Sequence, residues 1–165
     1  MTSEAFTTCL WFDGRAEEAA DHYLSVFKNS EPGRVTRYTE AGPGPAGTAI
    51  TVDFTLNGQH FLALNGGPEF TFNESVSFQI HCADQDEVDH YWDRLTEDGG
   101  RPGQCGWLKD RFGVSWQVVP TELPGLLADP DHEKAARTTR ALFTMTKPDI
   151  GALRAAYAGE QHAGE

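Results

Sequence analysis

The sequence predicts an α+β protein built from two successive βαβββ modules and followed by a helical extension. Three observations carry this prediction: a short β-rich run precedes an amphipathic helix twice, strands follow each helix, and the pattern turns helical after Pro120. We expect module one at about residues 7–65, module two at about 76–120 and C-terminal helices at about 121–158, all within one domain of 165 residues. The modules repeat in element order and not in residue identity.

In module one, apolar residues recur at helical spacing over Arg15–Phe27, which predicts an amphipathic helix. Pro32-Gly33 is expected to separate this helix from the next strand, and Ala41–Gly47 is expected to form a loop. Asn57-Gly58 is a strong signal for a two-residue hairpin. The predicted strands of this module are Thr7–Phe12, Arg34–Thr39, Ala49–Leu56 and His60–Leu64.

In module two, Asp84 is expected to cap a helix that Gly99-Gly100 ends, and a very short strand must follow that helix. The longer predicted strands are Val76–Cys82, Cys105–Leu108 and Val114–Val119. Beyond them, helices are expected at Glu122–Leu127, after a cap at Asp129 or Asp131, and at Ile150–Tyr157 after Asp149.

The composition excludes several classes of function. A net charge of -12 and a pI near 4.8 argue against nucleic acid and anionic membranes as partners, and favour a cationic ligand. The start of the chain predicts no signal peptide, and no stretch predicts a membrane span, so we expect a cytoplasmic protein. Cys9, Cys82 and Cys105 show no paired spacing and are expected to be free, buried thiols.

Motif searches find no HExxH, GxSxG, GxGxxG or Walker sequence, so we expect no metal and no cofactor. What remains is a set of polar and aromatic residues around two hairpins. In Asn65–Ser75, Phe70 and Phe72 either fasten the core or form an aromatic wall beside the amides of Asn65 and Asn73. In Cys105–Pro120, the tryptophans are expected to be anchors and Lys109-Asp110 to form a solvated turn with a local ion pair.

Three segments, FDGRAEEAADHYLSVF, ALNGGPEFTFNESVSFQIHC and CGWLKDRFGVSWQVVP, together with the repeated element order, resemble PhnB-like proteins. These belong to the glyoxalase/bleomycin-resistance, or vicinal oxygen chelate, superfamily and are often named for a 3-demethylubiquinone 3-methyltransferase domain. The resemblance runs from Thr8 to about Ala156. It implies a curved mixed sheet around a pocket, usually in a homodimer. Methyl transfer is not expected, because the glycine-rich turn of the usual methyl-donor fold is missing.

The resemblance also implies where a metal would bind. Metal-dependent members take one ligand from the first and one from the last strand of each module, typically His and Glu. Here those positions would be Thr8, about Ala63, Ser77 and Gln117. Because alanine cannot ligate and neutral hydroxyl and amide oxygens bind weakly, the resemblance does not extend to the metal.

Our hypothesis from the sequence is a metal-free protein that binds a small, aromatic or cationic organic molecule. The residues expected to line its pocket are Trp11, Asn65, Phe70, Phe72, Ser77, Gln79, Trp107 and Gln117. One alternative is a metal-independent enzyme in which Asp110 or His81 acts as acid or base. Another is an assembly or regulatory module whose aromatic residues serve an interface.

Overall fold

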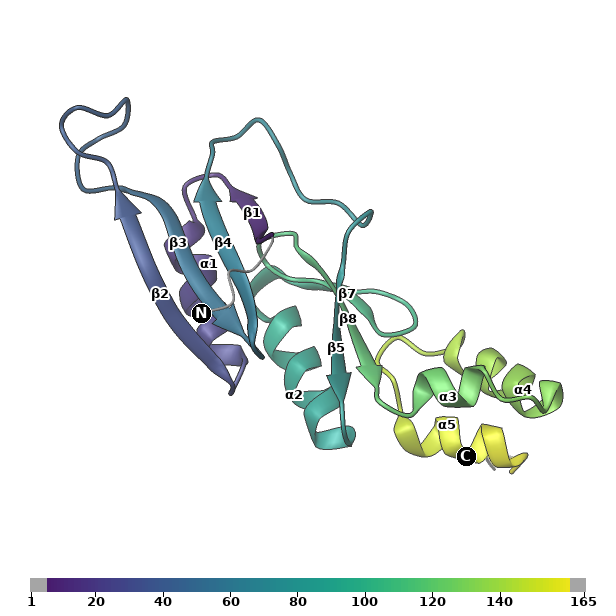
Figure 1. Cartoon of the computed structure of the whole chain (residues 1–165). Helices are drawn as coiled ribbons and strands as arrows, with labels where there is room; N and C mark the ends of the chain where they lie inside the picture. Colours follow the sequence, from purple (N-terminus) through teal and green to yellow (C-terminus); the bar gives the residue numbers. More distant parts are fainter. Residues whose placement is uncertain (1–5, 161–165) are drawn as a thin grey trace. The chain divides into compact units, whose positions relative to one another are not determined.

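The computed structural model describes residues 6–160, which form two compact units that divide after Phe72 (Figure 1). Each unit contains a four-stranded, open, mixed sheet. Sheet A, in the first unit, has the strand order β1-β4-β3-β2, and sheet B, in the second, has the order β5-β8-β7-β6. The same order of strands therefore occurs twice, which confirms the predicted α+β class and the repeated βαβββ module.

The first unit is built from five elements: β1 (Thr8–Phe12), α1 (Ala16–Val26), β2 (Ser30–Arg37), β3 (Ala49–Leu56) and β4 (Gln59–Asn65). The β1–β4 pair is parallel, and the β3–β4 and β2–β3 pairs are antiparallel. Helix α1 packs on one face of the sheet, where Tyr23 lies 5.9 Å from Phe54 and Phe54 stacks on Phe61 at 5.5 Å between ring centroids. These rings form the core of the unit.

The predicted hairpin between β3 and β4 is confirmed. Asn57 and Gly58 both have positive φ, at 49° and 80°, as a two-residue turn of the primed type requires. The turn sets the register of the pair, with Leu56 opposite Gln59.

Strand β2 begins earlier than predicted. Pro32-Gly33 was expected to break the chain but lies inside the strand. The strand tolerates the proline because β2 is at the edge of sheet A and its pairing with β3 shifts register between Pro32 and Val35. A glycine is needed there, since a Cβ on Gly33 would lie 2.6 Å from the Asp53 carbonyl oxygen.

The second unit contains sheet B, helix α2 and the C-terminal helices. Its elements are β5 (Phe78–Cys82), α2 (Gln85–Thr96), the short helix η1 (Glu97–Gly99), β6 (Arg101–Pro102), β7 (Trp107–Lys109), β8 (Ser115–Pro120), α3 (Leu123–Leu127), α4 (His132–Leu142) and α5 (Ile150–Ala158). Strand β6, two residues long, is the very short strand that the sequence required. Asp84 caps α2 as expected, accepting from the amide of Glu87 at 2.9 Å.

The C-terminal helices form a small core of their own and pack against sheet B. Asp131, rather than Asp129, caps α4, and Asp149 caps α5. The core consists of Leu123, Leu142 and Leu153, with the partly buried Cys105, Val119, Leu127 and Met145 against it. Because Val119 belongs to β8, these helices cover one end of sheet B. Among residues 6–160, no helix combines the length and the apolar character needed to cross a membrane.

The three cysteines are free, as predicted, but only Cys82 is buried. Cys9 is exposed, which corrects the expectation of buried thiols. The reason is its position: β1 is an edge strand, and Cys9 alternates with Leu10, whose side chain is buried.

Candidate functional site

One face of sheet B packs on α2, and the other carries most of the polar groups. Along β8, the buried Trp116 and Val118 alternate with Gln117 and Val119, which are only partly buried. Helix α2 contacts β5, β7 and β8, so the buried set faces the helix. We call the opposite side of sheet B the polar face; its residues are Ser77, Gln79, His81, Arg101, Trp107, Lys109, Ser115 and Gln117.

A hydrogen-bonded row crosses the polar face. The Gln79 side-chain amide donates to Gln117 Oε1 at 3.3 Å, and Gln117 Nε2 donates to Ser77 Oγ at 2.8 Å. Trp107 lies beside this row, because its Cα pairs with that of Gln117 across β7 and β8. Four of the residues predicted to line a pocket are therefore neighbours on one surface.

Two further groups on the polar face were not predicted. Ser115 is 1% exposed, and its hydroxyl has no hydrogen-bond partner among the described residues. Its strand partner is Lys109, whose ammonium lies 2.6 Å from Glu74 Oε1. This ion pair lowers the pKa of Glu74, chiefly through the hydrogen bond from Lys109. Alternation along β8 would have placed Ser115 on the same face as Gln117.

Asp110 does not belong to a solvated turn, which corrects the prediction. The residue is 3% exposed. Its Oδ1 accepts from the amides of Phe112 and Val114 at 2.9 and 3.0 Å, and its Oδ2 accepts from Trp116 Nε1 at 2.8 Å. The expected local pair with Lys109 is also wrong, since Lys109 binds Glu74. The carboxylate closes the β7–β8 hairpin, and these bonds occupy the oxygens that acid–base chemistry would use.

His81, the other candidate acid or base, is exposed near the end of β5. Its Cα pairs with that of Val119, which packs against the C-terminal core. The side chain thus lies at the border between the polar face and the C-terminal helices.

In the first unit, Trp11 and Phe70 form an edge-to-face pair at 5.0 Å, and Phe12 and Phe72 form another at 5.2 Å. The indole Nε1 of Trp11 donates to the Gly67 carbonyl at 2.8 Å. Phe70 itself is 62% exposed. Both phenylalanines therefore hold the segment after β4 against β1, while the outer side of Phe70 stays open to solvent.

Asn65 braces the first unit. Its Oδ1 accepts from the amide of Ala16 at 2.9 Å, and its Nδ2 donates to the Ala49 carbonyl at 3.1 Å. The first amide of α1 is thus satisfied from β4, because Arg15 at the helix start makes no capping bond. These bonds occupy the oxygen and one amide hydrogen that a ligand would otherwise contact.

The open face of sheet A holds a polar group that the sequence reading missed. His60 Nε2 lies 3.1 Å from Asp53 Oδ1, and its Nδ1 lies 3.4 Å from Thr7 Oγ1. His60 was expected to be exposed, whereas about a third of its side chain is accessible. A carboxylate beside one imidazole nitrogen keeps the proton on that nitrogen, and the other ring nitrogen is then a hydrogen-bond acceptor.

The four positions that the resemblance assigned to metal ligands lie on different kinds of sheet face: two on the polar face of sheet B, and two on the side of sheet A that faces α1. Ser77 and Gln117 touch, but Ala63 is fully buried beneath α1, and its strand partner is the buried Leu10. Thr8 lies on the same side as Leu10 by alternation. The counterparts of Ser77 and Gln117 in sheet A are therefore Thr7 and Leu62, one residue away on each strand.

Leucine cannot ligate, and threonine, serine and glutamine offer only neutral oxygens. Among the described residues, moreover, His, Cys, Asp and Glu side chains form no group of three or more that could hold a metal ion.

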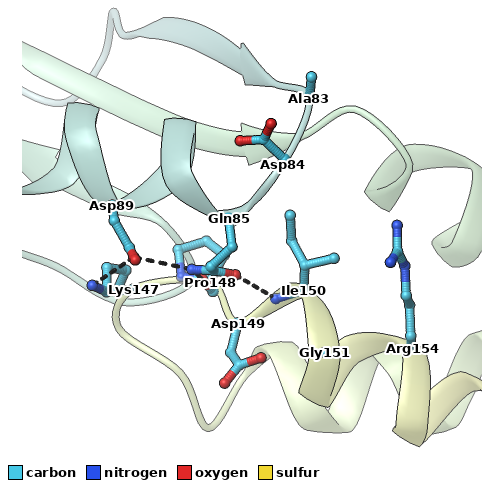
Figure 2. Close-up of a pocket in the computed structure, with 10 residues that line it drawn as sticks. All are labelled: Ala83, Asp84, Gln85, Asp89, Lys147, Pro148, Asp149, Ile150, Gly151 and Arg154. Carbon is cyan, nitrogen blue, oxygen red and sulfur yellow. Dashed lines mark hydrogen bonds and ion pairs between the residues drawn. The ribbon is translucent and has the colours of Figure 1, made fainter.

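A hollow of about 580 Å³ lies where α2 and α5 begin (Figure 2). Gln85 crosses it, with Nε2 donating to Asp89 and to the Pro148 carbonyl, while its Oε1 accepts from the Ile150 amide at 2.9 Å. Lys147 lies 2.7 Å from Asp89, and their hydrogen bond raises the pKa of the lysine and lowers that of the aspartate. These polar groups bind one another rather than leaving donors and acceptors open for a ligand. Their hydrogen bonds fasten the start of α5 to α2.

The family model described as 3-demethylubiquinone-9 3-methyltransferase matches residues 4–119, well over half of the chain. The chain belongs to this family. Its PhnB-like character agrees with a solved structure described as a putative 3-demethylubiquinone-9 3-methyltransferase, PhnB protein, from Bacillus cereus. That protein is 37% identical over 71% of this chain and 99% of its own, with a TM-score of 0.65.

More distant structures share the fold of this PhnB-like chain. Protein PA1353 from Pseudomonas aeruginosa is 20% identical, with a TM-score of 0.58, over 72% of this chain and 98% of its own. The fosfomycin resistance protein FosX from Mesorhizobium loti is 13% identical, with a TM-score of 0.54, over 78% of this chain and 100% of its own. The chain thus has the glyoxalase-type fold of the vicinal oxygen chelate superfamily. No protein of curated function matches its sequence.

Proposed function

We propose that this PhnB-like protein binds a small, flat organic molecule on the polar face of sheet B. The observation that carries the proposal is the row formed by Gln79, Gln117 and Ser77 beside the half-buried ring of Trp107. An aromatic wall next to a few fixed polar groups is the usual composition of a small-molecule site. The amides fix one another's orientation and keep donors for a ligand.

Binding on this face is proposed to need no metal. Ser77 and Gln117 stand where a metal-using relative would place ligands, and they hydrogen-bond to each other instead. Their neutral oxygens are weak ligands for a divalent metal ion when no carboxylate or imidazole lies beside them. Methyl transfer, which the family's name suggests, has no support in the sequence, because no glycine-rich loop for a methyl-donor nucleotide is present.

The proposal is tested by screening flat organic compounds against the full chain by thermal shift and following the hits by NMR. A compound bound on the polar face shifts the side-chain amide signals of Gln79 and Gln117 and the indole signal of Trp107. Gln117→Met, which keeps the size of the side chain, should weaken binding about tenfold. Gln59→Met, on the exposed end of β4, is the matched control. Hits whose affinity survives both Gln117→Met and Gln79→Met would contradict the proposal.

The pair of His60 and Asp53 favours a second candidate function, that of a metal-independent enzyme. The carboxylate orients the imidazole, and a substrate that displaces the long 3.4 Å contact of Thr7 Oγ1 gives its acidic proton to Nδ1. Exchange of the acidic hydrogens of 1,3-dicarbonyl compounds in D₂O, followed by NMR, tests this activity. His60→Gln should abolish any catalysed exchange, and Asp53→Asn should reduce it about a hundredfold. Exchange at the uncatalysed rate with the unmodified protein would rule this candidate out.

We also propose that the protein is a homodimer, as expected of PhnB-like proteins. Light scattering coupled to gel filtration should then give twice the chain mass of 18.1 kDa. A mass of a single chain at all concentrations would contradict this.

A further inference from the structure

The polar face differs in charge from the rest of the protein. The chain has 25 acidic residues and a net charge of -12. Strands β5, β6, β7 and β8, however, contain no aspartate or glutamate, and they contribute His81, Arg101 and Lys109 to the polar face. A ligand on this surface meets the local charges first, because those at a distance are screened by salt.

The uncharged groups on the polar face add hydrogen-bond donors. Ser77 Oγ accepts from Gln117, which leaves its own hydrogen to donate onward. The Ser115 hydroxyl, 1% exposed and without a partner among the described residues, lies beside Lys109 in the strand register. Since Ser115 Oγ has almost no accessible surface, Ser77 is the serine whose hydroxyl a ligand on this face can reach.

The chain already places one carboxylate against this surface. Glu74 lies in the turn that precedes β5, and its side chain is 63% exposed although it contacts Lys109 at 2.6 Å. Lys109 is more enclosed, at 31%. Exposed ion pairs contribute little to stability, so one carboxylate can replace another on the lysine at small cost.

We propose that the polar face is a site for a flat organic anion, whose carboxylate or similar oxyanion displaces Glu74 from Lys109. The ring of such a ligand lies against Trp107, and its oxygens reach Lys109 and the Ser77 hydroxyl. Glu74 occupies the anion position in the free protein and competes with the ligand for it. This inference rests on the proposed binding function and specifies that the ligand is an anion. The local charge, rather than the net charge of the chain, selects an anion over a cation.

The test uses three probes with one ring system and different charges: 2-naphthoate, 2-naphthamide and 2-naphthylmethylammonium. Titration of the full chain by calorimetry and NMR at about 0.15 M salt, where distant charges are screened, should show the carboxylate binding about three- to tenfold more tightly than the amide, and the ammonium most weakly. Added salt should reduce the advantage of the carboxylate.

Two variants test the competition with Glu74. Lys109→Met should remove the preference for the carboxylate. Glu74→Gln should tighten binding of the carboxylate about two- to fivefold, because the competing charge is gone. Lys147→Met, which breaks a similar lysine–aspartate pair beside α2, is the control and should leave the affinities unchanged.

The outcomes separate this inference from the proposed function. Equal binding of all three probes, with shifts at Trp107 and Gln117, would support the binding site and overturn the choice of an anion. A preference for the ammonium, or a carboxylate preference that persists in Lys109→Met, would also overturn it. If none of the three probes binds, both proposals fail for flat ligands of this size.

Discussion

The carboxylate of Asp110 accepts a 2.8 Å hydrogen bond from the indole Nε1 of Trp116, and both side chains are buried. The same carboxylate accepts from two backbone amides in the turn between them. One aspartate thus fixes both the turn and the tryptophan of the hairpin that ends in Gln117. Gln117 follows Trp116 directly in β8. The bonds that hold Trp116 therefore also hold the backbone of Gln117, the central residue of the hydrogen-bonded row on the polar face.

Asp110→Ala should destabilise the protein by roughly 2–5 kcal/mol, because three donors lose their acceptor inside the protein. Asp110→Asn should cost less, since one oxygen remains. Chemical denaturation of both variants measures the effect. Asp98→Asn is the control, because Asp98 is exposed and asparagine tolerates its positive φ. Among the described residues, its ion pair is with Arg111. Equal stability of Asp110→Ala and Asp98→Asn would show that the hydrogen bonds to Asp110 contribute nothing.

The sequence predicted the elements well where local chemistry decides them. Asn57-Gly58 determines its own turn, and the register that follows would also have placed Asp53 and His60 as diagonal neighbours on one face. The hydrogen bond between them could therefore have been predicted. Asp84 and Asp149 were identified as caps for the same reason, since a cap depends on a few neighbouring residues.

The site was harder to predict because it depends on which face a side chain occupies. A shift of one residue moves a side chain to the opposite face of a strand, and so Thr8 and Ala63 were taken in place of Thr7 and Leu62. Asp110 was misread because its neighbours in the turn are polar. Its burial depends on an indole six residues away, and no local pattern shows that contact.

Gln85→Ala should loosen the C-terminal helices. The substitution leaves the amide of Ile150 without its acceptor and removes the bond to the Pro148 carbonyl, at a cost of about 1–3 kcal/mol. Hydrogen exchange should speed up in α5 while the amides of sheet A keep their protection. Gln104→Ala, at an exposed position, is the control. Unchanged exchange in α5 would show that Gln85 does not fasten it.

The thiols of Cys9 and Cys82 should react in the order of their exposure. Burial, together with the nearby Glu87 and Asp84, raises the pKa of Cys82 to about 12. Partial burial of its thiol also raises the pKa of Cys9, but the residue is exposed to reagents. Ellman's reagent should therefore label Cys9 in the native protein, faster as pH rises, and Cys82 only on unfolding. Cys9→Ser should remove the fast phase. A fast phase that survives in Cys9→Ser and disappears in a Cys82→Ser variant would contradict this order.

Tyr157 should ionise late in alkaline titration. Its hydroxyl donates to Asp129 Oδ2 at 2.7 Å, and this bond, followed by burial, raises the pKa of Tyr157 above its ordinary value of 10.0. A raised pKa in the folded state means that the contribution to stability is complete below pH 10.0 and is lost as the pH rises through the folded value. The difference in phenolate absorbance between the unmodified protein and Tyr157→Phe reports this group alone. Asp129→Asn should shift that titration to lower pH, and an unshifted curve would show that Asp129 does not hold the proton.

Gly66→Ala should displace Trp11. A Cβ at residue 66 would lie 2.3 Å from the indole ring, much closer than any real contact, and Gly66 itself has no positive φ, so the strain is steric. The ring must move, and its bond to the Gly67 carbonyl is then lost. We expect a loss of roughly 1–3 kcal/mol in the free energy of unfolding and a changed tryptophan emission. Gly125→Ala, where a Cβ meets nothing within 4 Å, is the matched control and should be neutral or slightly stabilising, because alanine is the better helix former in α3. If Gly66→Ala behaved like the control, the ring of Trp11 would not be held by the bend that follows β4, and its contact with Phe70 would have to hold it instead.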